Sequence, residues 1–295
     1  MLIPQRNSEH IKKVSPVFGV GIIKEMKNKK SFMRSIAAAP HMLWAGLFIV
    51  VPLIIVLGFA FSDAEGGFSL ENITSLADYG EIFLLSMELA IIATFICLLV
   101  GYPLAYIMAK AEPRKQRILL MLLMLPMWTN LLIRTYSIMA LLDDGGFINQ
   151  LLGTDFHIIG TKGAVIFGMV YDFLPYMVLP IYTCISKIDK NMWEAASDLG
   201  CAPIQVLTKV IFPLSMSGVI SGVTMVLVPS ISTFYISQKL GGGTFELIGD
   251  VIERQFVSNC HNVGAAISLV MMVLILISLG IMNKFGDSEN GGIIV

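Results

Sequence analysis

The sequence lacks the short motifs that mark the common classes of enzyme. It has no G-x-x-x-x-G-K-[ST] phosphate loop, so we do not expect this chain to bind and hydrolyse ATP by itself. It also has no H-E-x-x-H zinc motif and no G-x-S-x-G nucleophile elbow. The four cysteines and four histidines stand far apart, which supports neither a disulfide framework nor a metal site. We therefore expect no catalytic residue, no metal and no cofactor in this chain.

Charged residues are scarce as well. They make up only 14% of the chain, against about 25% in soluble globular domains, whereas 56% of the residues are hydrophobic. This composition predicts a polytopic membrane protein. No basic repeat interleaved with aromatic residues suggests nucleic-acid binding.

Long apolar runs predict an all-α membrane protein with six transmembrane helices. A hydrocarbon core of about 30 Å needs about 20 helical residues at about 1.5 Å each. We expect Pro175, Pro180 and Pro229 to interrupt the fourth and fifth spans. Gly218 and Gly222 allow close helix approach, either within the chain or at a subunit interface. The spans are expected near 41–61, 84–108, 118–141, 163–185, 214–234 and 265–282.

The loops predict the orientation of these spans. Sixteen Lys and Arg lie on the side of both termini, and only Lys162, Lys239 and Arg254 lie in loops on the other side. The positive-inside rule places both termini in the cytosol. The basic N-terminus is either disordered or lies on anionic lipid. We divide the chain into a basic cytosolic tail at 1–40, a transmembrane domain at 41–285 with a cytosolic loop at 186–213, and a C-terminal tail at 286–295.

The 186–213 loop holds a predicted amphipathic helix at 189–199. Asp189 or Asn191 can cap it, and Asn191 with Glu194 has capping-box spacing. Gly200 can adopt the left-handed conformation that ends the helix, and 204–210 can form a second one. One interpretation is an ordinary loop on the bilayer surface. The apolar residues Met192, Ala195, Ala196 and Leu199 recur at i, i+3, i+4 and i+7 on one face.

Ionisable side chains inside the spans form a second candidate site, because each costs roughly 2.5–3.5 kcal/mol on insertion scales. Asn130 and Arg134 are four residues apart and should share a helix face. We hypothesise that Asp172 and Trp128 line a conduit that favours a di- or polyammonium ion through charge and cation–π contacts. Alternatively, Arg134 forms a structural ion pair with Glu88 or Asp172, and the aromatic residues form an interfacial belt. The candidate pathway residues are Glu88, Trp128, Asn130, Arg134, Tyr171, Asp172 and Tyr176.

The spacing from Glu194-Ala195-Ala196 through Gly200 to Pro213 resembles the EAA loop of permease subunits of binding-protein-dependent (type I) ABC importers. Over roughly residues 41–282 the chain further resembles the spermidine and putrescine permeases of that family. This second resemblance rests on Gly101 to Ala105, Leu125 to Asn130 with Arg134 to Tyr136, Leu174 to Tyr182, and Gly249 to Phe256. The resemblance implies a coupling helix between helices 4 and 5, with ATPase-coupling residues Met192, Trp193, Glu194, Ala195, Ala196, Asp198, Leu199 and Gly200.

The resemblance also implies partners and a location. These are a homologous second permease, two ATPase subunits that bind ATP and Mg²⁺, an extracytoplasmic polyamine-binding protein, and the lipid bilayer of a bacterial cytoplasmic membrane. The chain departs from the family in its long basic N-terminus. Glu88 and Asp172 stand where neutral amides are expected, which leaves their role open.

Other functions remain open. The chain could be an importer permease for another small solute. An ATP-independent channel or carrier would not need the EAA spacing, and no inverted repeat is evident. An intramembrane aspartyl protease would need a G-x-G-D motif after Tyr171-Asp172, but Leu247-Ile248-Gly249-Asp250 lacks the first glycine. The sequence does not distinguish spermidine from putrescine.

Overall fold

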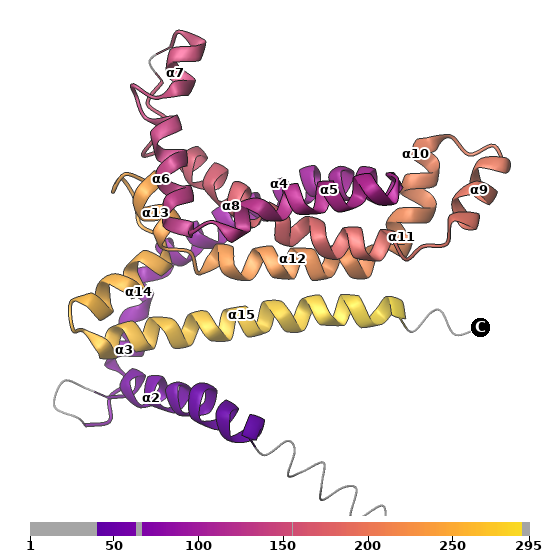
Figure 1. Cartoon of the computed structure of the whole chain (residues 1–295). Coiled ribbons are helices and arrows are strands. Elements are labelled where there is room, and N and C mark those ends of the chain that lie inside the picture. The colour runs from indigo at the N-terminus through magenta and orange to yellow at the C-terminus, as the bar shows by residue number, and fades with distance from the viewer. Residues whose placement is uncertain (1–39, 63–66, 155, 291–295) are drawn as a thin grey trace, which may run out of the picture. The chain divides into compact units, whose positions relative to one another are not determined.

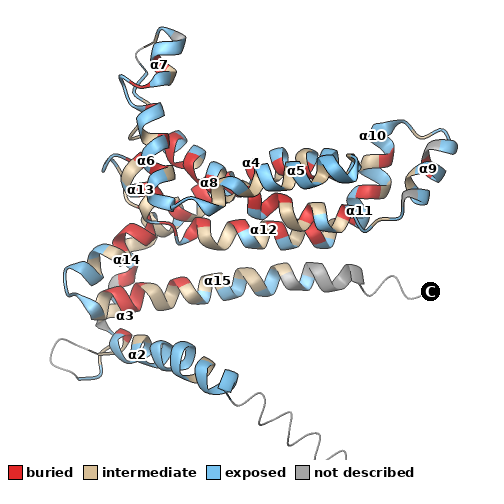
Figure 2. Ribbon diagram, in the orientation of Figure 1, coloured by how far each residue is buried: buried red, intermediate tan, exposed pale blue. Residues whose placement is uncertain are grey.

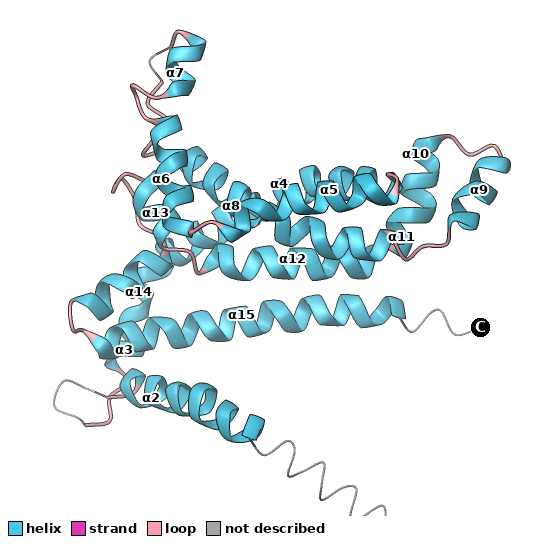
Figure 3. Ribbon diagram, in the orientation of Figure 1, coloured by secondary structure: helices cyan, strands magenta, loops and turns pink. Residues whose placement is uncertain are grey.

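The computed structural model describes residues 40–62, 67–154 and 156–290, which are helical and contain no strand (Figure 3). The predicted tail at 1–40 lies outside the described residues except for Pro40, as do the last five residues of the predicted C-terminal tail. The elements are η1 Gly46–Val50, α2 Val51–Ala60, α3 Glu71–Thr74, η2 Ser75–Tyr79, α4 Gly80–Lys110, α5 Pro113–Met124, η3 Leu125–Trp128, α6 Leu131–Leu142, α7 Phe147–Leu152, α8 Lys162–Ile185, α9 Lys190–Asp198, α10 Pro203–Val206, η4 Leu207–Ile211, α11 Phe212–Leu214, α12 Met216–Ile231, α13 Tyr235–Leu240, α14 Ile248–Val257 and α15 His261–Asn290.

The chain forms two compact units, Met1–Val56 and Leu57–Val295. In the first unit, the described residues are helical from Pro40 onward and include a π-helical turn at η1. The Trp44 and Phe48 rings lie 5.5 Å apart on this helix. Its apolar side chains are mostly exposed, as expected for a helix surrounded by lipid or by other proteins.

The second unit has its core where α4, α8 and α12 pack together (Figures 1 and 2). A Cβ atom on Gly218 would lie 2.8 Å from the Cβ of Cys184, and one on Gly222 would lie 2.8 Å from the Sδ of Met177. Both neighbours belong to α8. The two glycines of α12 therefore allow close helix approach within the chain. Of the two contacts that the sequence left open, within the chain or at a subunit interface, the structure shows the first.

Four helices are long and apolar enough to cross a membrane, and two bent pairs bring the number of candidate spans up to six. Pro113–Trp128 meets Leu131–Leu151 at 94°, and Pro203–Leu214 meets Met216–Ile231 at 71°. The predicted interruptions at Pro175, Pro180 and Pro229 are wrong, because α8 and α12 remain helical through these residues. A proline removes one backbone hydrogen bond, and packing against neighbouring helices compensates for the loss. The unbroken helices are Pro40–Ala60, Asn72–Lys110, Lys162–Ile185 and His261–Met282.

The bend in the third span begins at the short 3₁₀ segment η3, which contains Pro126. Asn130 then adopts an extended conformation, and its side-chain oxygen accepts a hydrogen bond from the Leu132 N–H at 2.8 Å. Asn130 is therefore the N-cap of α6, and Trp128 lies on the other side of the bend. The expected i, i+4 relation of Asn130 and Arg134 is present at the start of α6, where the Arg134 N–H donates to the Asn130 carbonyl oxygen at 3.1 Å.

Candidate functional site

The 186–213 loop contains the predicted short helix, now α9. The Asp189 carboxylate accepts a hydrogen bond from the Asn191 N–H at 3.0 Å, so Asp189 rather than Asn191 caps the helix. Gly200 has a φ of +79°, the left-handed conformation that the sequence predicted at this position. A second helical run follows at Pro203–Leu214. The helix–glycine–helix order is confirmed.

Helix α9 packs against the rest of the chain with different residues than its predicted apolar face. The Trp193 ring stacks on Tyr106 of α4, with centroids 5.6 Å apart and planes within 6°, and Ala196 is buried. Met192 is exposed, and Leu199 is 85% exposed. The predicted apolar face is therefore split between two environments. Trp193 and Ala196 face the rest of the chain, because the indole gains more apolar contact against Tyr106 than in water.

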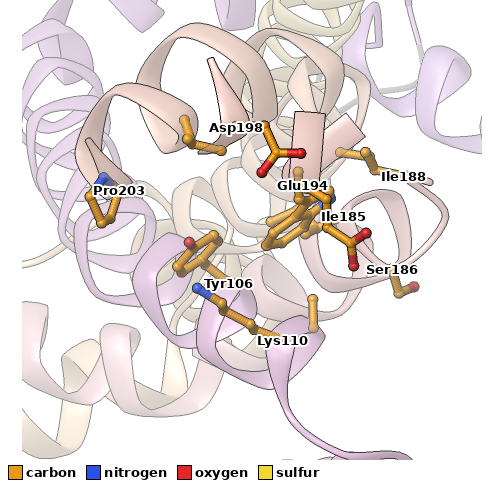
Figure 4. A pocket seen from close by; sticks show the side chains of 11 residues that line it. Tyr106, Lys110, Ile185, Ser186, Ile188, Glu194, Asp198 and Pro203 are labelled. Carbon is orange, nitrogen blue, oxygen red and sulfur yellow. The ribbon is translucent and has the colours of Figure 1, made fainter. Parts of the chain in front are cut away.

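A cavity of about 470 Å³ lies beside this aromatic stack (Figure 4). Tyr106 and Lys110 line it from α4, and Glu194 and Asp198 line it from α9. The Lys110 ammonium lies 5.7 Å from the centre of the Tyr106 ring. The sequence analysis missed both α4 residues, although their spacing of four at the end of the second span places them on one helix face. Thus α9 rests on a stack and a small side chain, with open space beside them.

The second candidate site contains a buried ion pair between α6 and α8. Arg134 Nη1 lies 2.9 Å from Asp172 Oδ1, and the two side chains are 13% and 1% exposed. Glu88 instead pairs with Lys162 at 3.5 Å, near the surface. Of the two partners considered for Arg134, the structure shows Asp172. A carboxylate buried at this depth needs a counter-charge, and Arg134 supplies it.

The predicted conduit residues do not form one surface. Trp128 is 76% exposed, whereas Asp172 is buried against Arg134. Tyr171 and Tyr176 of α8 are exposed, and the Tyr176 ring lies 6.4 Å from that of Phe173. In this structure Asp172 faces its counter-ion and Trp128 is exposed, and the hypothesis that the two line one conduit stays a prediction. The exposed aromatic residues remain available to a ligand.

Comparisons with known proteins agree with this architecture. Residues 101–287 match the family described as "Binding-protein-dependent transport system inner membrane component". The chain is 39% identical over 246 residues to the spermidine/putrescine transport system permease protein PotB of Escherichia coli (strain K12), covering 78% of this chain and 90% of that protein.

Two solved structures of a bacterial ABC transporter that imports the acidic polysaccharide alginate share the fold. One gives a TM-score of 0.71 at 15% identity and covers 90% of this chain and 99% of that chain. The other, in complex with an alginate pentasaccharide-bound periplasmic protein, also gives 0.71 at 15% identity, with coverage of 88% and 95%. At this identity the similarity concerns the fold alone.

Proposed function

The chain belongs to the family of binding-protein-dependent transport system inner membrane components, and from this premise we propose that it is the permease subunit of an ATP-driven importer of spermidine or putrescine. It is a multi-pass membrane transport component rather than an enzyme. The polyamine substrate is supported by the PotB relative, which matches along most of both chains.

The proposed partners follow the same similarity. They are a PotC-like second permease, two PotA-like ATPase subunits that bind ATP and Mg²⁺, and a PotD-like extracytoplasmic polyamine-binding protein. The periplasmic protein bound to the alginate transporter supports the last of these by similarity of fold. We place the chain in a bacterial cytoplasmic membrane with both termini in the cytosol, because most of its Lys and Arg fall on that side.

The exposed apolar side chains of residues 189–214, hereafter the coupling segment, carry the proposal that it binds an ATPase subunit. Met192 and Leu199 are exposed in the loop between two candidate spans, and Ile204 is exposed near the start of the bent span that begins at Pro203. Clustered apolar side chains on an otherwise polar segment mark an interaction site. In this proposal Glu194, Ala195 and Asp198 complete the face that the ATPase contacts.

The seating of α9 suggests how movement reaches the membrane. Trp193 stacks on Tyr106 in the last turns of α4, and the chain continues from Gly200 into α10 and then α12. Since α4 and α12 both pack on α8, a displacement of α9 reaches the core along two routes. ATP binding would draw the ATPases together, move α9 with them, and reorient the bundle around the substrate.

The proposed substrate pathway includes the exposed aromatic residues Trp128, Tyr171 and Tyr176. Their rings can bind ammonium groups through cation–π contacts. The Arg134–Asp172 pair joins α6 to α8. Asn130 caps α6, and Glu88 with Lys162 forms a surface pair, so these groups position the pathway rather than contact the substrate.

The test is ATPase activity of the reconstituted importer with its binding protein and a panel of solutes. We expect stimulation by spermidine or putrescine. Stimulation only by another solute would keep the permease and discard the polyamine. Leu199→Asn should lose the ATPase subunits during purification. The matched control is Leu151→Asn on α7, which alters a residue 71% exposed far from the coupling segment. Equal retention in the two variants would contradict the coupling role.

A further inference from the structure

Four basic residues of the described structure lie outside the N-terminal tail and the proposed cytosolic side. Three of them pair with carboxylates: Arg134 with Asp172 at 2.9 Å, Lys162 with Glu88 at 3.5 Å, and Arg254 with Glu246 at 2.6 Å. The fourth is Lys239 of α13, which has no carboxylate oxygen within 4.0 Å among the described residues. The Lys239 ammonium therefore differs from the other three cations in having no carboxylate partner among the described residues.

Two tyrosine rings surround the Lys239 ammonium. The nitrogen lies 5.5 Å from the ring centre of Tyr136 and 5.8 Å from that of Tyr235. The two rings meet edge to face, 6.4 Å apart with planes at 81°. Both distances fall within the roughly 6 Å at which a ring attracts a cation. Tyr136 and Tyr235, here called the tyrosine clamp, come from α6 and α13, which pack together (Figure 1).

The group in the clamp has the chemistry of the proposed substrate. A lysine side chain is a primary ammonium on a flexible alkyl stem, as is each end of a short alkyl polyamine. Tyr136 is 47% exposed, so an external ligand can reach the clamp while the fold stays intact. Helices α6 and α13, which carry the clamp, lie at the end of α8 opposite α9, and in the proposed orientation that end faces the binding protein (Figure 1).

On the basis of the proposed function, we propose that the tyrosine clamp is an ammonium-binding site on the entry side of the permease. Lys239 occupies the site in the absence of substrate, and an ammonium group of an entering polyamine displaces it. No bond is made or broken, because one ammonium replaces another on the same pair of rings. Lys239 is then a tethered competitor that lowers the apparent affinity for substrate.

Variants of the reconstituted importer test this exchange by the spermidine concentration that gives half-maximal ATPase stimulation. Lys239→Met keeps an unbranched side chain one atom shorter and removes the competing cation, so this concentration should fall about 3- to 10-fold. Tyr136→Phe keeps the ring face and should stay closer to wild type than Tyr136→Leu. Tyr136→Leu removes the ring face and should raise the concentration. An unchanged or raised value for Lys239→Met would overturn the proposal.

A second measurement uses NMR to detect whether Lys239 occupies the clamp, and it does not depend on transport. Reductive methylation with ¹³C keeps the charge of the lysine ammonium, and the rings should shift the Lys239 methyl resonance upfield. The resonance is assigned by its absence from Lys239→Met. Millimolar spermidine should move it to the position of a free lysine while leaving Lys162 unchanged; an unmoved Lys239 resonance overturns the exchange. If the proposed polyamine function is itself wrong, no polyamine stimulates the ATPase activity of the wild-type importer. This outcome can be distinguished from failure of the clamp proposal alone.

Discussion

The two ends of the second unit are built differently. At the end that contains α13 and α14, here called the outer end, buried polar groups bond to one another. Asp250 accepts hydrogen bonds from the Leu247 N–H at 2.7 Å and from the Ser237 hydroxyl at 2.8 Å. Ser86 of α4 accepts one from the Ile248 N–H, also at 2.8 Å. These bonds satisfy the first turn of α14 within this chain.

The coupling segment is held differently. Its helix α9 contacts the bundle through the Trp193–Tyr106 stack and the buried Ala196, with a cavity of about 470 Å³ beside them. Its large apolar side chains at Met192 and Leu199 are left exposed. The two ends thus differ in what holds them, which is buried hydrogen bonds at the outer end and an aromatic stack beside a cavity at the coupling segment. Substitutions at the two ends and between them should therefore change the free energy of unfolding by different amounts.

The largest effect is expected at the ion pair between the two ends. Arg134→Met leaves the Asp172 carboxylate buried without its counter-charge, which costs about 3–5 kcal/mol. The double variant Arg134→Met with Asp172→Leu removes both charges and should recover most of that loss. Thermal unfolding of the solubilised permease measures both. If the double variant is as unstable as the single one, the pair is not what stabilises the contact between α6 and α8.

The same site tests the substrate role that the sequence suggested for Asp172. Asp172→Asn keeps the shape of the side chain and removes its charge. Because the carboxylate faces Arg134, we expect the variant to lose stability while the apparent affinity for polyamine stays unchanged. Uptake measured over a range of spermidine concentrations provides the check. A large loss of affinity in correctly folded protein would restore Asp172 to the list of substrate contacts.

Close packing at the outer end predicts the next largest effect. A Cβ atom on Gly249 would clash with the Thr233 carbonyl oxygen and would lie 2.8 Å from that of Ser232. Gly249→Ala therefore forces α14 away from the end of α12, at a cost of about 1–3 kcal/mol. The control is Gly145→Ala, where nothing lies within 4 Å. Equal melting temperatures for the two variants would show that the outer end is packed more loosely than described.

The buried Asp250 predicts a smaller, pH-dependent effect. Burial raises the pKa of its carboxyl from 3.8 to about 6, helped by the charges of Glu246 and Glu253 and opposed by its two hydrogen bonds. The folded state therefore binds the proton more tightly than the unfolded state. Compared with Asp250→Asn, wild type should gain about 1 kcal/mol in its free energy of unfolding when the pH falls from 7.5 to 5. This gain is lost again as the pH rises through 6. A pH-independent difference between the two proteins would contradict this.

Sequence patterns predicted the elements of this fold better than their contacts. The second and fourth spans, expected at 84–108 and 163–185, are observed within Gly80–Lys110 and as Lys162–Ile185. Capping by Asp189 and the turn at Gly200 were predictable because each depends on neighbouring residues alone. The bend at Asn130 was missed although Pro126 signals it, because an apolar run of sufficient length looks the same whether it is straight or broken.

The site was harder to predict for a different reason. In a membrane protein, apolar residues occur on faces that meet the core, the lipid or a partner, so periodicity does not reveal which way a side chain points. Trp193 turned inward onto Tyr106, which is 87 residues earlier in the chain. The tyrosine clamp joins α6 to α13 across a similar separation. Such contacts depend on how the helices pack, which no local pattern contains.

The smallest expected effect on the free energy of unfolding comes from comparing one substitution at two matched glycines, where we expect a difference close to zero. Gly200 in the coupling segment has a φ of +79°, and Gly243 beyond α13 has a φ of +74°, and neither would place a Cβ atom within 4 Å of a neighbour. Valine at either position therefore costs about the same backbone strain, on the order of 1–2 kcal/mol. The unfolding midpoints of Gly200→Val and Gly243→Val should agree, yet only Gly200→Val should lose polyamine-stimulated ATPase activity, because it redirects α9 relative to α10. Loss in both variants would mean that strain anywhere impairs the protein, and normal activity in Gly200→Val would remove the coupling segment from the mechanism.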